Sequence, residues 1–273
     1  MNASGSTGPP REPWDPNRGY PGHWPPYQPY PSPRPGDGIF RILAILLVFA
    51  LVFSIAFGSM FFWRDAETPL TSDDFDPATG GTRTYTWRYD HQIYSTTLNL
   101  SLEQYLIYHA NTADHAPESY QQMRSFVLPQ DPTVWVLGRQ LNNLSVSKGF
   151  DALDRVNFVL AFVQSIPYSL DGESTEQNEY WRYPVETLYD KTGDCEDTAI
   201  LYASLLEAIF FDSVLIIYSD HVATGVACPS AHGTYFELDD RDYYYCETTG
   251  SGWEVGELPP DVSMVAQDII QVP

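Results

Sequence analysis

The segment KTGDCEDTAILYASLL, residues 191–206, places a cysteine at the start of an apolar helix. Asp194 is a good N-cap for this helix, and Glu196 and Asp197 lie in the first turn, where carboxylates are stabilised by the helix dipole. Asp197 also lies three residues after the N-cap, which is the reach-back position of a capping box. The sequence therefore predicts a helix that begins at Cys195, with its thiol surrounded by acids that oppose ionisation.

Four strand-like segments follow this helix, and two further helices and a β-rich segment precede it. Residues 213–219, 221–228, 234–238 and 242–249 are the strands, and DDRD at 239–242 is a turn between the last two. Residues 151–166 form a helix with Asp151 as N-cap and Pro167 as its end, residues 102–110 form a short helix, and residues 84–100 form one or two strands. The pattern predicts an α+β fold in which the 195 helix packs on an antiparallel meander.

The first 81 residues divide into three parts of different composition. Residues 1–38 are rich in Pro, Gly and Tyr and are expected to be disordered, with polyproline II character and with a partner that the sequence does not identify. Between Arg41 and Arg64 stand 22 uncharged residues, which span roughly 33 Å as a helix. This length predicts a transmembrane helix at 39–63, followed by a linker at 64–81 and a folded domain at 82–273.

The orientation of this anchor is set by few charges. Positive-inside logic, with Arg34 and Arg41 before the span and Arg64 after it, favours a cytoplasmic N-terminus and an extracytoplasmic C-terminal domain in the cell membrane. A cleaved signal peptide fits less well, because the apolar run and the tail before it are long and no A-x-A site follows. Sequons at Asn99 and Asn143 are compatible with that orientation.

The charge balance excludes one class of partner. The chain has 36 acids, 14 bases and a net charge of −22 at pH 7, and only two of the bases are lysines, Lys148 and Lys191. An acidic surface with lysine nearly absent resembles that of proteins from salt-loving archaea, although a specific cationic partner is an alternative use of the acidity. Nucleic acid is excluded as a partner, since no basic stretch is present to bind phosphates.

Cys195, His221 and Glu247 form a candidate catalytic set. Each follows the previous one by 26 residues, and they lie on the predicted helix and on two predicted strands. A thiol nucleophile, an imidazole base and a carboxylate that orients the imidazole are the groups that cysteine acyl transfer requires. The backbone N–H of Cys195 could also stabilise an oxyanion. Each residue alone could be structural, and a buried inert cysteine is common.

These segments resemble the transglutaminase-like superfamily, which has a papain-like core. The resemblance covers about residues 168–259 and rests on RYPVETLYDKTGDCEDTAILYASLLEAI at 182–209, DHVATGV at 220–226 and YYYCETTGSGWEVGELP at 243–259. It is strongest to a microbial branch with Glu-Thr-Thr where many relatives have Asp-Pro-Thr. The resemblance implies that Cys195, His221 and Glu247 are the catalytic triad, in agreement with the reasoning from chemistry.

The sequence departs from that branch at two places. Asp220 stands where Gly usually precedes the histidine, and Phe210-Phe211 replace a Gly-Tyr after the nucleophile helix, which removes a residue suited to a left-handed C-cap. Asp220 adds a charge beside the base. An upstream aromatic residue is a candidate for the second donor to the oxyanion, and we assign this role to Trp181.

Other chemistry is less well supported by the sequence. No metal-ligand spacing and no cofactor motif is present, so we expect neither. Cys228 and Cys246 could form a disulfide outside the cell, and the sequence leaves this open. Cys246 is expected to point away from Glu247, because strand side chains alternate between faces.

The sequence thus predicts a membrane-anchored cysteine enzyme acting on peptide or carboxamide bonds of a protein or peptide through a thioester. Hydrolysis, as a peptidase or amidase, is favoured over cross-linking. The alternative is a non-catalytic cell-envelope binding module that keeps the fold.

Overall fold

The central element of the fold is the helix that begins at Cys195. We analysed a computed structural model that describes residues 73–110, 115, 119–175, 179–260 and 262–273, within the unit Pro69–Pro273. The predicted tail and transmembrane helix, and the linker up to residue 72, lie outside the described residues. Among the residues that are described, no helix is long and apolar enough to cross a membrane.

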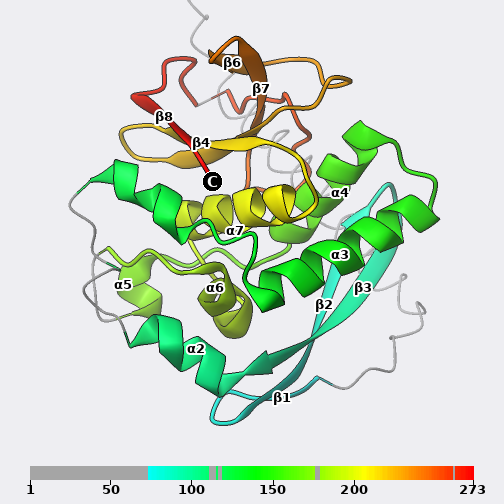
Figure 1. The fold of residues 1–273 in the computed structure, drawn as a ribbon, viewed down its shortest axis with the longest axis vertical. Coiled ribbons are helices and arrows are strands. Elements are labelled where there is room, and N and C mark those ends of the chain that lie inside the picture. The colour runs from blue at the N-terminus through cyan, green and yellow to red at the C-terminus, as the bar shows by residue number, and fades with distance from the viewer. Residues whose placement is uncertain (1–72, 111–114, 116–118, 176–178, 261) are drawn as a thin grey trace, which may run out of the picture. The chain divides into compact units, whose positions relative to one another are not determined.

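The elements form layers around that helix (Figure 1). In chain order they are β1 (Asp74–Asp76), β2 (Gly80–Tyr89), β3 (Gln92–Ser101), α2 (Leu102–His109), η1 (Tyr120–Phe126), α3 (Pro132–Ser147), α4 (Ala152–Val163), α5 (Asp171–Ser174), α6 (Pro184–Asp190), α7 (Cys195–Ala208), β4 (Ser213–Ile217), β5 (Val222–Val226), β6 (Tyr235–Leu238), β7 (Arg241–Cys246) and β8 (Asp268–Gln271). Helix α7 packs on β4 and β5 on one side and on α3, α4 and α6 on the other. The fold is therefore mixed α+β with antiparallel sheets, as predicted.

The larger sheet is antiparallel throughout, in the order β6-β7-β5-β4-β8. The predicted meander is wrong in this detail, because β7 pairs with β5 and leaves β6 at the edge. Strands β6 and β7 form a tight hairpin, with Asp239 and Asp240 both at positive φ, and the second strand of this hairpin is the one that pairs with β5. This order places the end of β7, and hence Glu247, beside the start of β5.

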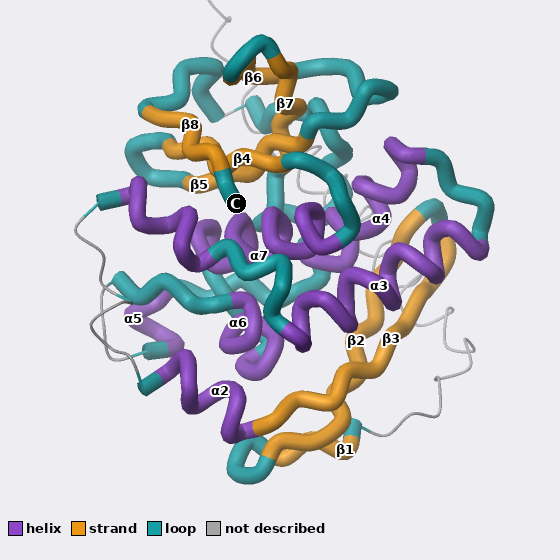
Figure 2. Tube along the Cα trace, viewed as in Figure 1, coloured by secondary structure: helices purple, strands orange, loops and turns teal. Residues whose placement is uncertain are grey.

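The smaller sheet covers the opposite end of the helical layer (Figure 2). Its order is β1-β2-β3, and Trp87 of β2 packs edge-on against Phe158 and Phe162 of α4. The segment 84–100 therefore forms two strands of one hairpin. The pairing of β1 with β2 extends the sheet into the predicted linker, since residues 74–76 and 80–81 are strand residues.

The predicted helices are confirmed at 102–109, 152–163 and 195–208, with Asp151 and Asp194 as N-caps. Six elements were not predicted: β1, η1, α3, α5, α6 and β8. Helix α3 begins at Pro132, with Asp131 accepting hydrogen bonds from the first backbone N–H groups. Its Gly138 faces α7, where a Cβ would lie 3.2 Å from the Cβ of Ala208. Helix α3 also packs on α4 and β3.

The end of α7 departs from the expectation drawn from Phe210. This residue adopts the left-handed conformation, with φ of 67°, although it is not glycine. The N–H of Phe211 donates to the carbonyl of Leu206 at 3.0 Å, and the N–H of Phe210 donates to that of Glu207 at 3.1 Å. The helix is thus closed by Schellman-type bonds despite the side chain.

Replacing Phe210 by glycine should stabilise the protein. The left-handed conformation costs a non-glycine residue about 1–2 kcal/mol, and the Phe210 side chain is 79% exposed, so little packing is lost. We expect the free energy of unfolding of Phe210→Gly to rise by about 1 kcal/mol in urea denaturation. Phe211→Gly is the control, and it should destabilise; a fall in stability for both variants would contradict the argument.

Candidate active site

The start of α7 is held by a reciprocal pair of carboxylates. Asp194 accepts from the N–H of Asp197, and Asp197 accepts from the N–H of Asp194, each at 3.3 Å. This is the predicted capping box. Gly193, just before the cap, lies so close to Asp197 that a Cβ would approach its Cβ to 2.7 Å. A side chain at position 193 would displace the turn that leads into Cys195.

Arg182 neutralises this buried cluster of carboxylates. Its Nη1 lies 2.6 Å from Asp197 Oδ2 and 3.2 Å from Asp171 Oδ1, and its backbone N–H donates to Asp197 Oδ1 at 2.7 Å. The carboxylates of Asp171, Asp194 and Asp197 lie within 4.8 Å of one another. This set could in principle ligate a cation, but the guanidinium of Arg182 already supplies positive charge to two of its three members.

A single arginine does not balance all of these acids. Burial, followed by the charge of Asp197, raises the pKa of Asp194 to about 9. Burial also raises the pKa of Asp197, to about 7, although Arg182 opposes the shift. We infer that Asp197 carries the charge that pairs with Arg182 and that Asp194 retains a proton at neutral pH. The N-cap bond is compatible with this, because Asp194 needs only an oxygen acceptor.

The Cys195 thiol lies between two groups with opposite effects. It donates to Glu196 Oε2 at 2.7 Å. Burial, then the charge of Glu196 and this hydrogen bond, raise the pKa of the thiol, whereas the backbone N–H of Val222 lowers it. Val222 directly follows His221, so the sulfur lies beside the start of β5. The thiol thus donates its hydrogen bond to Glu196 and not to His221. The sequence analysis did not predict this hydrogen bond.

His221 and Glu247 are joined directly. Nε2 of His221 lies 3.0 Å from Oε2 of Glu247, and the His221 side chain is 19% exposed. Burial alone would raise the pKa of Glu247, but the bond to His221 and the bonds from Thr249 outweigh it and lower the pKa to about 2. An ionised carboxylate only accepts hydrogen bonds, so it holds the proton on Nε2 and leaves Nδ1 of a neutral imidazole as an acceptor.

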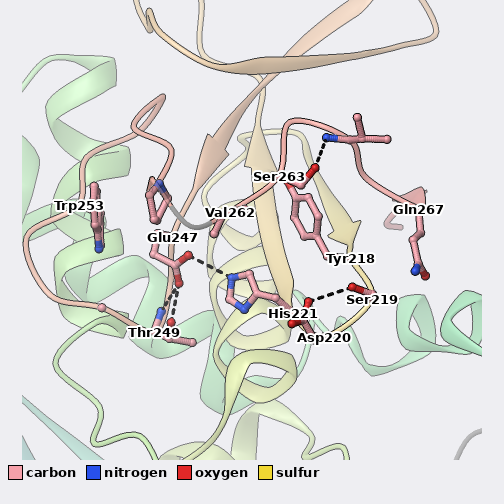
Figure 3. A pocket seen from close by; sticks show the side chains of 13 residues that line it. Tyr218, Ser219, Asp220, His221, Glu247, Thr249, Trp253, Val262, Ser263 and Gln267 are labelled. Atoms are coloured by element: carbon pink, nitrogen blue, oxygen red, sulfur yellow. Dashed lines mark hydrogen bonds and ion pairs between the residues drawn. The ribbon is translucent and has the colours of Figure 1, made fainter. Parts of the chain in front are cut away.

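Three hydrogen-bond donors besides His221 fix the Glu247 carboxylate, and Figure 3 shows the two from Thr249. The buried Tyr245 hydroxyl donates to Oε2 at 2.8 Å. The N–H and the hydroxyl of Thr249 donate to Oε1 at 3.0 Å and 2.6 Å. Sequence reasoning missed both residues, although Tyr245 is two positions before Glu247 on a strand and therefore shares its face.

Two further hydrogen bonds made by threonine hydroxyls connect α7 to the strands that carry His221 and Glu247. Thr198 Oγ1, one turn after Cys195, lies 3.0 Å from Thr248 Oγ1. Thr224 Oγ1 of β5 donates to the carbonyl of Ala199 at 3.1 Å. In the Glu-Thr-Thr segment, Glu247 therefore supplies the orienting carboxylate, Thr248 contacts the nucleophile helix and Thr249 donates hydrogen bonds to the carboxylate.

Trp181 lies beside the nucleophile helix and not in the cavity at His221. It is 4% exposed and packs in the same buried cluster as Ala199 and Ile200 of α7. Its ring stacks on Tyr120 at 5.7 Å between centroids. Burial, then the charges of Glu196, Glu179 and Cys195, raise the pKa of Tyr120, which places that hydroxyl near the thiol. The oxyanion role of Trp181 stays a prediction, and Tyr120 is a neighbour that the sequence did not identify.

A cavity of about 630 Å³ adjoins His221 and Glu247. Figure 3 shows Glu247, Thr249 and Trp253 on one side of His221, with Ser219 and Asp220 on the other. Cys195 is not among the residues that line this cavity. His221 lines the cavity, and the backbone N–H of the next residue, Val222, contacts the thiol.

The other two cysteines and the buried His115 have structural surroundings. All three cysteines are free, so the disulfide that the sequence left open is not formed, and Cys228 and Cys246 lie in the main core. His115 is fully buried, and its ring nitrogens lie 2.7 Å from the carbonyl of Trp181 and 3.0 Å from that of Tyr108. These contacts agree with an ordinary role for residues outside the predicted triad.

Asparagine at positions 194 and 197 should have very different effects. Asp197→Asn leaves Arg182 without its closest buried partner, and breaking such a pair costs about 3–5 kcal/mol. Asp194→Asn keeps the N-cap. The pKa of Asp194 is higher in the folded state than in the unfolded chain. The protonated carboxyl therefore contributes stability at a pH below the unfolded-state pKa, and this contribution is lost as pH rises towards the folded-state pKa of about 9.

The measurement is urea denaturation of both variants at pH 6 and pH 9. We expect Asp197→Asn to be strongly destabilised at pH 9, where Asp197 is ionised, and less so at pH 6, which lies below its pKa of about 7. Asp194→Asn should lose less stability than the wild type between pH 6 and pH 9. An equal pH dependence for Asp194→Asn and the wild type would contradict protonation of Asp194.

Comparisons with known proteins give two partial structural likenesses. A comparison with protein-family models finds no match, and neither does one with curated proteins. Among solved structures, a TGase is 14% identical to this chain, with a TM-score of 0.32 over 72% of this chain. A candidate cysteine protease from Cytophaga hutchinsonii is 13% identical, with a TM-score of 0.30 over 61% of this chain. The chain covers 53% and 61% of the two structures, respectively. The chemistry of the site is therefore argued from this chain's own residues.

Proposed function

We propose that this protein is a cysteine acyl-transfer enzyme of transglutaminase-like type, with Cys195 as nucleophile, His221 as acid–base and Glu247 as the orienting group. The observation that carries the proposal is the His221–Glu247 bond of 3.0 Å at the start of β5, next to the Val222 N–H that favours the Cys195 thiolate. A fully hydrogen-bonded carboxylate behind an imidazole, beside a helix-borne thiol, is the arrangement required for this chemistry.

The proposed reaction is hydrolysis of a peptide or carboxamide bond. Nδ1 of His221 takes the thiol proton, and the sulfur attacks the carbonyl carbon. The C–N bond then breaks, the amine leaves with the proton from His221, and a thioester remains on Cys195. Water, deprotonated by His221, attacks the thioester; the C–S bond breaks, the acid leaves, and the proton returns to the sulfur.

Hydrolysis is favoured over cross-linking because water needs no dedicated binding site. In cross-linking, an amine would replace water in the second step, and the thioester would be the same. The residues that carry the first step therefore do not depend on which acceptor is used.

The alternative, a non-catalytic envelope module, is favoured by one specific observation. The thiol donates to Glu196, and burial together with that carboxylate raises its pKa. A thiol held in this way is inert unless the proton can pass to His221. The two functions therefore differ in whether His221 controls the reactivity of Cys195.

The rate of iodoacetamide labelling at Cys195 separates them. If the proposal holds, His221→Gln slows labelling, because the imidazolium partner of the thiolate is lost. Glu196→Gln should speed labelling by about tenfold, since a hydrogen bond to a charged group contributes about 1.5–3 kcal/mol. The two replacements thus act in opposite directions.

Cys228 and Cys246 serve as internal controls, since they are 2% and 0% exposed. They should label more slowly than Cys195 in the folded protein. Equal labelling of the wild type and His221→Gln, with both folded, would favour the non-catalytic module. Cys195→Ala should in addition abolish peptide and amide hydrolysis.

We further propose that residues 39–63 anchor the enzyme in the cell membrane with the C-terminal domain outside, on the basis of the 22 uncharged residues between Arg41 and Arg64. The net charge of −22 is compatible with a salt-rich surrounding.

Protease added to intact cells should remove the domain, with a cytoplasmic protein as the protected control. Protection of the domain, with known surface proteins digested, would reverse the orientation.

A further inference from the structure

The cavity at His221 contains a buried hydroxyl without a protein partner. Tyr218 is 5% exposed and lines the cavity, and its hydroxyl has no hydrogen-bond partner among the described residues. A buried polar group left unpaired costs about 1–3 kcal/mol. The Tyr218 ring stacks beside that of His221 at 6.2 Å between centroids. A ligand in this cavity could satisfy the hydroxyl within a few ångströms of the base.

The position of the cavity relative to the thiol indicates which part of a substrate it would hold. Tyr218 packs with Val214 and Ile216 in one buried cluster, whereas Leu215 and Ile217, which alternate with them on β4, pack with Ala199 of α7 in another. The cavity thus opens on the face of the sheet away from the nucleophile helix. His221 stands between the two sides. Since His221 would protonate the leaving amine, the departing segment passes over the imidazole towards this cavity.

The lining indicates the charge of that segment. It contains the carboxylate of Asp220, the indole of Trp253 and the polar side chains of Ser263 and Gln267, and no lysine or arginine is among the described residues that line it. Both oxygens of Glu247 are already hydrogen-bonded, so Asp220 is the carboxylate that remains for a ligand. A carboxylate with no lysine or arginine beside it in the lining favours a cationic ligand.

Asp220 is held at the rim by the local turn. The N–H of Tyr218 donates to the carbonyl of His221 at 2.9 Å, which makes Ser219 and Asp220 the two loop residues between β4 and β5. The Ser219 hydroxyl donates to Asp220 Oδ1 at 3.0 Å. The same short turn therefore positions both the imidazole of His221 and the carboxylate of Asp220.

We propose that this cavity binds the leaving side of the substrate, and that Asp220 and Tyr218 select a departing segment with a positively charged side chain. The proposal rests on the proposed function, because it assigns the cavity to a substrate of Cys195. A volume of about 630 Å³ falls within the usual range of ligand pockets, about 300–1,000 Å³. The class of substrate is then a peptide or amide whose departing part carries a lysine-like or arginine-like group.

The test is binding of two matched probes to the full-length chain carrying Cys195→Ala, which prevents turnover. L-lysinamide and L-norleucinamide differ only in the side-chain ammonium. Calorimetric titration should show lysinamide binding about fivefold more tightly, the upper range for a solvent-accessible ion pair. Asp220→Asn should remove this preference. Tyr218→Phe should weaken both probes by about threefold or more, as expected for loss of a hydrogen bond.

Asp242→Asn is the matched control, since Asp242 is an exposed acid on β7 outside the cavity. It should leave both affinities unchanged, and circular dichroism should show that every variant is folded. Equal binding of the two probes, or an unchanged preference in Asp220→Asn, would overturn the proposal.

The binding result is independent of the cysteine mechanism. Selective lysinamide binding that depends on Asp220, in a chain whose Cys195 is unreactive, would support the cation site and reject only the proposed function. Failure of selectivity in a chain whose Cys195 labels in a His221-dependent manner would reject the cation site and leave the proposed function standing.

Discussion

The position of the nucleophile depends on the buried ion pair between Arg182 and Asp197. Asp197 is fully buried, and its two oxygens accept from the backbone and side chain of Arg182 and from the N–H of Asp194. One carboxylate therefore joins the chain before α6 to the first turn of α7. Since breaking one side of a buried ion pair is costly, this contact fixes the turn that presents Cys195.

From that turn, a series of short hydrogen bonds extends to the other members of the site. Thr198 contacts Thr248, Thr224 contacts the Ala199 carbonyl, and Glu247 is clamped by Tyr245 and Thr249. The two threonine contacts join α7 to β5 and to the segment after β7, and the local bonds to Glu247 fix its carboxylate on that segment. A site on such rigid elements is more accurately positioned than one on loops alone.

The electrostatics of the site are asymmetric. On the α7 side, burial and then the carboxylate of Glu196 raise the pKa of the Cys195 thiol, whereas on the sheet side the bonds from His221 and Thr249 lower the pKa of Glu247 against the effect of its burial. The helix dipole and the Val222 N–H oppose the acids but do not outweigh them. A reactive thiolate would therefore depend on transfer of its proton to His221, and the acids would keep the thiol protonated until then.

The sequence by itself determined the elements whose signals are local. Asp151 and Asp194 identify two helix starts because a cap needs only its own first turn, and short runs of apolar, β-branched and aromatic residues identify the strands near His221 and Glu247. Helix α3 was missed although its start is also local, with Asp131 as N-cap and Pro132 in the first turn; only its packing against α7 through Gly138 was decided by tertiary structure. The strand order, the Glu196 bond to the thiol and the cavity at Tyr218 were likewise decided by tertiary structure. They depend on which distant segments meet, and the free energy of those contacts is set by burial and by neighbouring charge.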